Sequence, residues 1–185
     1  MTSLAHFNWR QYTGAVLGAL LLCAASADAM EVAPADVQAA VRTLGFLDSL
    51  QHRTSIAVGV VYRAGDAESK TLAQRTAAIL AATKAPNGSS IDTSVLAVNE
   101  LEQTGRRFDV VFLVLGVAEN GRPVAEFVRR QHVLSISNDP ACLMMQCCVL
   151  MVRAGARTEI VLDTALAEAT GSTFSSVFMM MVKRR

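Results

Sequence analysis

Three cysteines lie within seven residues towards the C-terminus, and thiols are side chains that can form disulfides, bind metals or act as nucleophiles. They are Cys142, Cys147 and Cys148. An odd number of neighbouring cysteines predicts one disulfide and one buried thiol. A bridge between adjacent cysteines strains the peptide that joins them, so we predict a Cys142–Cys147 disulfide with Cys148 buried. The flanking Leu, Met and Val residues offer a thiol no base and no cause for a lowered pKa, which argues against a catalytic cysteine.

Polar side chains follow three apolar segments, at the points where predicted strands end. They are Arg63 and Asp66 after the first segment, Glu119 and Asn120 after the second, and Asn138 and Asp139 after the third. In an open α/β sheet, ligands bind beyond the carboxyl ends of the parallel strands. These six residues are therefore a candidate ligand edge for a small anion or polar metabolite, although ordinary strand-to-helix loops have a similar composition.

The motifs of common catalytic sites are absent from the sequence. No Gly-x-Gly-x-x-Gly follows the first predicted strand, and neither Gly-x-Ser-x-Gly nor a P-loop occurs. His52 and His132 precede strands, which places them at the edge opposite the candidate ligand edge. No second Cys or His pair completes a zinc site. We therefore predict a protein that is not an enzyme, with no catalytic residue, no metal and no cofactor.

Methionines are dense near the C-terminus and allow two interpretations. They are Met144, Met145, Met151 and the run 179–181. Soft sulfur ligands can bind cuprous copper, whereas methionine also fills irregular apolar space in a core. On the last predicted helix, Met179 or Met180 points outward. Met179 and Met180 are thus a candidate surface for a protein partner or a homodimer.

Hydrophobic periodicity predicts alternating strands and helices that would position these groups. Near-continuous apolar runs predict buried strands, and apolar residues at helical spacing predict helices. The predicted strands are 55–62, 91–98, 109–115, 133–137, 148–152 and 158–162, and the predicted helices are 35–47, 67–82, 121–131 and 166–182, with a short helix from 99 and a break at Gly171. The predicted fold is an α/β three-layer sandwich with a mostly parallel sheet and an antiparallel edge hairpin, in one domain spanning 30–185.

The first thirty residues have the layout of a secretory signal peptide. Arg10 precedes an apolar run at 15–22, and small residues follow up to Ala29. The apolar run is shorter than the roughly 20 residues that span a bilayer. We predict that residues 1–29 are cleaved and that the remaining chain works in the periplasm.

The charge of the chain is nearly balanced. It has 17 basic and 16 acidic side chains, a formal net charge of +1, and the predicted signal peptide contains one of each. This balance gives no reason to expect nucleic acid as a partner. The one basic cluster, Lys183, Arg184 and Arg185, is typical of a solvated C-terminal tail.

The order of these segments resembles the YfiR-like periplasmic proteins. The resemblance lies in residues 39–50, 56–61 and 108–115 of the first half, and in residues 133–139, 149–152, 157–163 and 172–176 with the terminal apolar helix. The chain departs from the family pattern at 51–53, 146–147 and 150. The resemblance implies a regulatory binding protein, such as a repressor of a membrane-bound diguanylate cyclase in cyclic-di-GMP signalling, with the cyclase's periplasmic sensor domain as its partner.

Two other functions compete with that of a periplasmic regulator. A single-domain periplasmic solute-binding protein would gain thermal stability from a small ligand. A thiol or copper-handling protein would lose binding when Cys142, Met144 or Met145 is replaced. The regulator is the function that the sequence favours.

Overall fold

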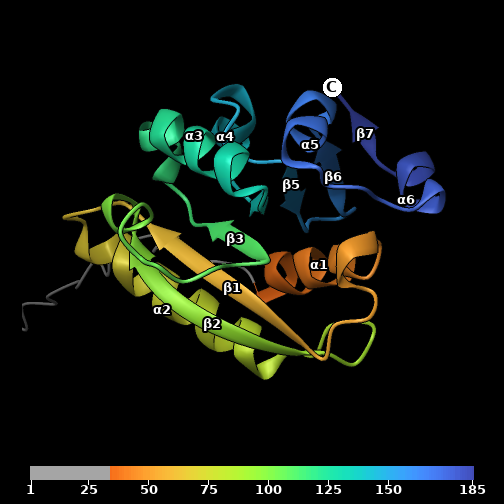
Figure 1. Ribbon diagram of the computed structural model, residues 1–185, viewed down its shortest axis with the longest axis horizontal. Coiled ribbons are helices and arrows are strands. Elements are labelled where there is room, and N and C mark those ends of the chain that lie inside the picture. The colour runs from red at the N-terminus through yellow and green to blue at the C-terminus, as the bar shows by residue number, and fades with distance from the viewer. Residues whose placement is uncertain (1–33) are drawn as a thin grey trace, which may run out of the picture.

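A computed structural model describes residues 34–185 and contains one seven-stranded sheet (Figure 1). The predicted signal peptide, residues 1–29, lies outside the described residues. The strands follow the spatial order β2-β1-β3-β4-β5-β6-β7. Their bounds are β1 Ser55–Tyr62, β2 Ser90–Ala97, β3 Val110–Leu113, β4 Leu134–Ser137, β5 Leu150–Arg153, β6 Glu159–Leu162 and β7 Lys183–Arg184.

The first five strands are parallel, and the hairpin at one edge is antiparallel. In the centre, Val60 of β1 is in register with Phe112 of β3, which in turn is in register with Ile136 of β4. β5 pairs in parallel with β4 and antiparallel with β6. The predicted α/β class, the mostly parallel sheet and the edge hairpin are confirmed.

Helices cover both faces of the sheet, as the three-layer prediction requires. The helices are α1 Pro34–Leu44, α2 Ala67–Ala82, α3 Gly121–Gln131, α4 Pro140–Met144, α5 Thr164–Thr170 and α6 Ser176–Met181, and the 3₁₀ helices are η1 Asp48–Leu50, η2 Val98–Glu100 and η3 Val117–Asn120. α1 contacts α2 on one face, and α3 contacts α5 on the other (Figure 1). No helix within 34–185 is both long and apolar enough to cross a membrane.

Carboxylates at the ends of strands start the helices that follow. Asp66 accepts hydrogen bonds from the backbone amides of Glu68 and Ser69 at the start of α2, and Asp163 accepts one from Leu166 at the start of α5. These side chains satisfy amides that have no partner inside the helix. The caps explain why α2 begins at the residue that the sequence predicts.

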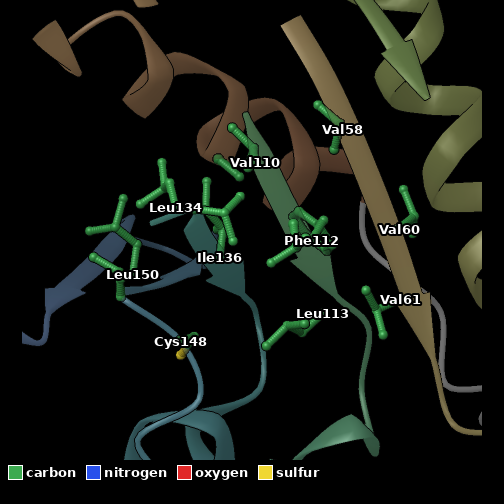
Figure 2. Close-up of a cluster of buried hydrophobic side chains, with 14 of the residues drawn as sticks. Val58, Val60, Val61, Val110, Phe112, Leu113, Leu134, Ile136, Cys148 and Leu150 are labelled. Atoms are coloured by element: carbon green, nitrogen blue, oxygen red, sulfur yellow. The ribbon is translucent and has the colours of Figure 1, made fainter. Parts of the chain in front are cut away.

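The core is formed by the apolar side chains of the central strands. All four residues of β3 and all four of β4 are buried, because helices cover both faces. Figure 2 shows Val58 of β1, Phe112 of β3, Ile136 of β4 and Leu150 of β5 in one cluster, with Cys148 among them. A rigid central sheet of this kind fixes the positions of the loops at both of its edges.

The C-terminal region matches its prediction in part. The predicted break in the helix 166–182 is confirmed, because α5 ends at Thr170 and is followed by Gly171, whose φ of +66° lies in the left-handed region that stops a helix. Lys183 and Arg184 have exposed side chains, as the predicted solvated tail requires, but their backbone is part of the sheet. They form β7, which pairs with β6, and Lys183 Nζ donates to Glu159 Oε1 at 2.7 Å. The unpaired backbone of the β6 edge explains this last strand.

Candidate functional site

The candidate ligand edge lies where the strand order reverses direction. From β1 the chain passes through α2 to the outer strand β2, and it then returns to β3 on the other side of β1. α2 and α3 lie on opposite faces, so the loops after β1 and β3 diverge (Figure 1). Such a topological switch point, at the carboxyl ends of the strands, is where open α/β sheets bind ligands.

Arg63 is the centre of an ion cluster at this switch point. Its Nε and Nη2 donate to Asp66 Oδ2 at 3.0 and 2.5 Å, and its Nη1 donates to Glu119 Oε2 at 2.6 Å. The side chain of Glu119 is 67% exposed, whereas that of Asp66 is 23% exposed. Asp66 is therefore the fixed partner of the guanidinium, and Glu119 is the partner that a ligand can replace.

Hydrogen bonds shift the pKa values within this cluster. The amide of Ser69 and then the guanidinium of Arg63 hold the pKa of Asp66 below its ordinary value. The hydrogen bonds to Asp66 and then to Glu119 raise the pKa of Arg63. Both shifts favour the charged forms, so Arg63 and Asp66 are ionised at neutral pH.

Asp139 joins the ends of β3 and β4 at the same edge. Its Oδ2 accepts from the backbone amide of Gly116 at 3.3 Å, and its Oδ1 accepts from the amide of Ala141 at 2.9 Å, which caps α4. The hydroxyl of Ser137 donates to Leu113 O at 2.9 Å and accepts from the amide of Asp139. Asp139 therefore positions the Gly116 loop that leads to Glu119.

Asn138 points to a residue that the sequence did not identify as part of the site. Its Nδ2 donates to Asp36 Oδ2 at 3.1 Å, and Asp36 Oδ1 accepts from the amide of Ala154 at 2.5 Å. Within 34–185, Asn138 Oδ1 is buried without a hydrogen-bond partner. Asp36 lies in the first turn of α1. The missed clue is that the first helix must run towards β1, which brings its N-terminus to the carboxyl edge.

The six predicted residues thus fall into groups. Arg63, Asp66 and Glu119 lie together, Asp139 supports the neighbouring loop, and Asn138 bonds to α1. Asn120 ends η3 and makes no side-chain cap for α3. Four carboxylates, counting Asp36, accompany one guanidinium. This arrangement can bind a ligand carboxylate at Arg63 and a ligand ammonium at the displaced Glu119.

The three cysteines lie together as free, buried thiols. The predicted Cys142–Cys147 disulfide is not formed in this structure and stays a prediction, whereas the predicted burial of Cys148 is confirmed. Cys147 Sγ donates to Cys142 O at 3.4 Å. The flanking residues gave no cause for a lowered thiol pKa, but hydrogen bonds from Cys147 and then Cys148 hold the pKa of Cys142 below its ordinary value. The contacts with Cys142 and then burial raise the pKa of Cys147 and of Cys148. Cys142 is fully buried, so no substrate reaches it.

Of the two methionines of the candidate partner surface on α6, only Met180 is exposed, and their role as a partner surface stays a prediction. Met180 is 79% exposed, but Met179 packs partly against the core. Val177 and Met181 on the same helix are exposed as well. The reason is that α6 is short and is anchored by Phe178, whose ring stacks on two other rings, those of Phe46 and Phe174, with centroids 5.2 and 4.9 Å away.

Comparison with known proteins identifies the fold. No family model and no curated protein matches the chain. Among solved structures, a conserved domain protein from Vibrio cholerae has a TM-score of 0.59 at 11% identity, over 83% of this chain and 60% of that one. An ABC domain from Streptococcus pneumonia, in complex with L-Trp, has a TM-score of 0.59 at 12% identity, over 81% and 60%. The chain thus shares their fold and spans about three fifths of their length.

Proposed function

We propose that the protein is a non-catalytic binding protein for a small zwitterionic solute, held at the carboxyl edge between β1 and β3. The observation that carries the proposal is the ion cluster of Arg63, Asp66 and Glu119 at the topological switch point. A solute carboxylate replaces exposed Glu119 on Arg63, and the displaced Glu119 then accepts the solute ammonium. The shared fold with a protein bound to L-Trp supports this class of ligand.

A thermal-shift screen tests the proposal. The probes are free amino acids, their methyl esters and their N-acetyl forms. A ligand at 100 times its Kd stabilises the folded protein by about 2.7 kcal/mol, which corresponds to a rise in Tm of about 5–11 °C for a domain of this size. We expect free amino acids to raise Tm and both blocked forms to lose most of the effect, because each lacks one of the two charges.

Matched variants locate the solute in the screen. Arg63→Ala is expected to raise Kd about tenfold or more, because it removes a charged hydrogen-bond donor. Arg75→Ala is the control, since Arg75 lies on the exposed side of α2 away from the edge, and its Kd is expected to stay within about twofold. Equal binding by Arg63→Ala and the wild type, or no stabilising amino acid at all, contradicts the proposal.

A second candidate function, regulation of a membrane-bound partner, is favoured by a separate observation. Val177, Met180 and Met181 expose apolar surface on α6. Apolar groups of this kind suit a protein partner such as the periplasmic sensor domain of a diguanylate cyclase, or a second copy of the chain. In-cell crosslinking followed by mass spectrometry tests this function. Recovery of a membrane cyclase that is lost with Met180→Lys supports it, and a sample without a membrane protein contradicts it.

Export to the periplasm is proposed as the setting for either function. It rests on residues 1–29, whose composition is typical of a signal peptide. Mass spectrometry of the protein purified from its native host is expected to find a chain that begins at residue 30. A chain that retains Arg10 would contradict export by this route.

A further inference from the structure

A polar pocket lies at the opposite edge of the sheet from the solute site, where β1, β3 and β4 begin. Its volume is about 800 Å³. Its lining includes four arginines, one carboxylate and an aromatic ring, namely Arg53, Arg106, Arg107, Arg130, Asp109 and Phe108. None of these residues belongs to the site at the carboxyl edge, so the pocket needs a separate explanation.

The pocket is positively charged even after its neighbours are counted. Asp109 lies in the lining, 3.5 Å from Arg53 Nη2. Two carboxylates outside the lining pair with two of the arginines, Asp92 with Arg106 and Glu102 with Arg130. Four guanidinium groups are therefore paired with three carboxylates, which leaves one positive charge in excess. A fourth carboxylate near Arg130, that of Glu126, is paired with Arg122.

Arg107 is the guanidinium that is available to a ligand. It is exposed, and it makes no hydrogen bond or ion pair with another residue of the described range 34–185. Its neighbour Arg106 already pairs with a carboxylate. A ligand that meets Arg107 therefore displaces no protein partner from it.

Arg106 is held in position before any ligand arrives. Its Nη1 donates to Ser94 Oγ at 2.6 Å, its Nη2 donates to Asp92 Oδ2 at 2.5 Å, and its guanidinium carbon lies 5.8 Å from the centre of the Phe108 ring. Asp109 is fixed as well, since its Oδ2 accepts from the amide of Ala57 at 2.9 Å. A binding site with ordered side chains loses little conformational entropy when a ligand binds.

From these contacts we propose that the pocket binds a soluble organic phosphate with at least two negative charges. Guanidinium groups present paired N–H donors that match the oxygens of a phosphate. The volume lies within the range of small-molecule sites, so it accommodates an organic group beside the phosphate. The partly exposed ring of Phe108 offers that group an apolar contact. This site is independent of the solute site at the other edge.

Calorimetric titration of the whole protein tests the proposal, with inorganic pyrophosphate and ATP as probes and citrate as the comparison anion. We expect saturable one-to-one binding of pyrophosphate and ATP. The affinity should fall between 50 and 200 mM salt, because the guanidinium groups are partly exposed and salt screens charges over a Debye length of about 10 Å. Arg107→Ala is expected to raise Kd about tenfold, and Arg75→Ala is expected to change it by less than about twofold. An unchanged Tm in each variant excludes loss of folding.

Three results would overturn the proposal. One is that neither phosphate probe binds, or that Arg107→Ala binds them as the wild type does. Another is that citrate binds as tightly as pyrophosphate, which would indicate a general polyanion site. The third is that the protein sediments with phosphatidylglycerol vesicles but not with phosphatidylcholine vesicles, while ATP and pyrophosphate fail to bind. That result would assign the phosphate group to a lipid surface.

Discussion

Replacement of Asp139 tests how the carboxyl edge is held together. Asp139 is only 7% exposed, and it accepts the amides of Gly116 and Ala141. Asp139→Ala leaves both amides without this acceptor. Loss of a helix cap costs about 1 kcal/mol, and loss of the second, partly buried hydrogen bond costs about another 1 kcal/mol. The expected total of about 2 kcal/mol corresponds to a fall in Tm of about 4–8 °C for a domain of this size.

Two further variants make the measurement decisive. Asp139→Asn keeps one carbonyl oxygen for the cap of α4 but turns its NH₂ towards the Gly116 amide, so we expect about half of the loss in Tm. Asp48→Ala is the control, because the side chain of Asp48 is exposed and does not cap a helix. The residue at the cap position of η1 is Leu47. Exposed substitutions change stability by less than about 0.5 kcal/mol. The melting temperatures are measured by differential scanning calorimetry. Equal Tm values for Asp139→Ala and Asp48→Ala would show that the Asp139 hydrogen bonds do not stabilise this edge.

Three other predictions concern packing, pH and thiols. Gly121→Ala places a Cβ 2.6 Å from Met145 Cβ, so we expect a loss of about 1–3 kcal/mol in urea unfolding. Gly105→Ala, which meets nothing within 4 Å, should cost much less. Because the pKa of Asp66 is lowered in the folded protein, its carboxylate stabilises the fold above the ordinary pKa of about 3.9. This stability is lost as the pH falls through the lowered pKa. Asp66→Asn should therefore reduce the loss of stability at acidic pH, measured as the free energy of unfolding against pH. Thiols are titrated in the unfolded protein that lacks residues 1–29 and was isolated without reductant. Three reactive thiols per chain are expected if all cysteines are free as in the structure, whereas one reactive thiol per chain would indicate a disulfide.

Local sequence signals predicted much of the fold. β1 spans 55–62, α2 spans 67–82 and α3 spans 121–131, as the sequence predicts, because strong apolar patterns and end signals coincide there. β7 was not predictable, since two charged residues carry no periodicity and their strand depends on the free edge of β6. The break between α5 and α6 was only partly indicated by Gly171.

The candidate site was predictable to the extent that it depends on topology. Arg63 and Glu119 are 56 positions apart, yet parallel strands bring their loops to one edge, so the sequence grouped them correctly. The contact between Asn138 and Asp36 depends on how α1 crosses the sheet, which no local pattern encodes. The arginines of the pocket at the opposite edge are spread over positions 53 to 130 of the sequence, so only the folded structure shows that they line one pocket.

The most direct test of the solute-binding account is the location of the bound amino acid. Amide resonances of the ¹⁵N-labelled protein are recorded while the best ligand of the thermal-shift screen is added. If the solute binds at the carboxyl edge, resonances of residues 63–66 and 116–120 shift with one common Kd, and those of 106–109, at the opposite edge, do not. Shifts confined to the opposite edge, or no shifts at ligand concentrations that raise Tm, would contradict binding at the carboxyl edge.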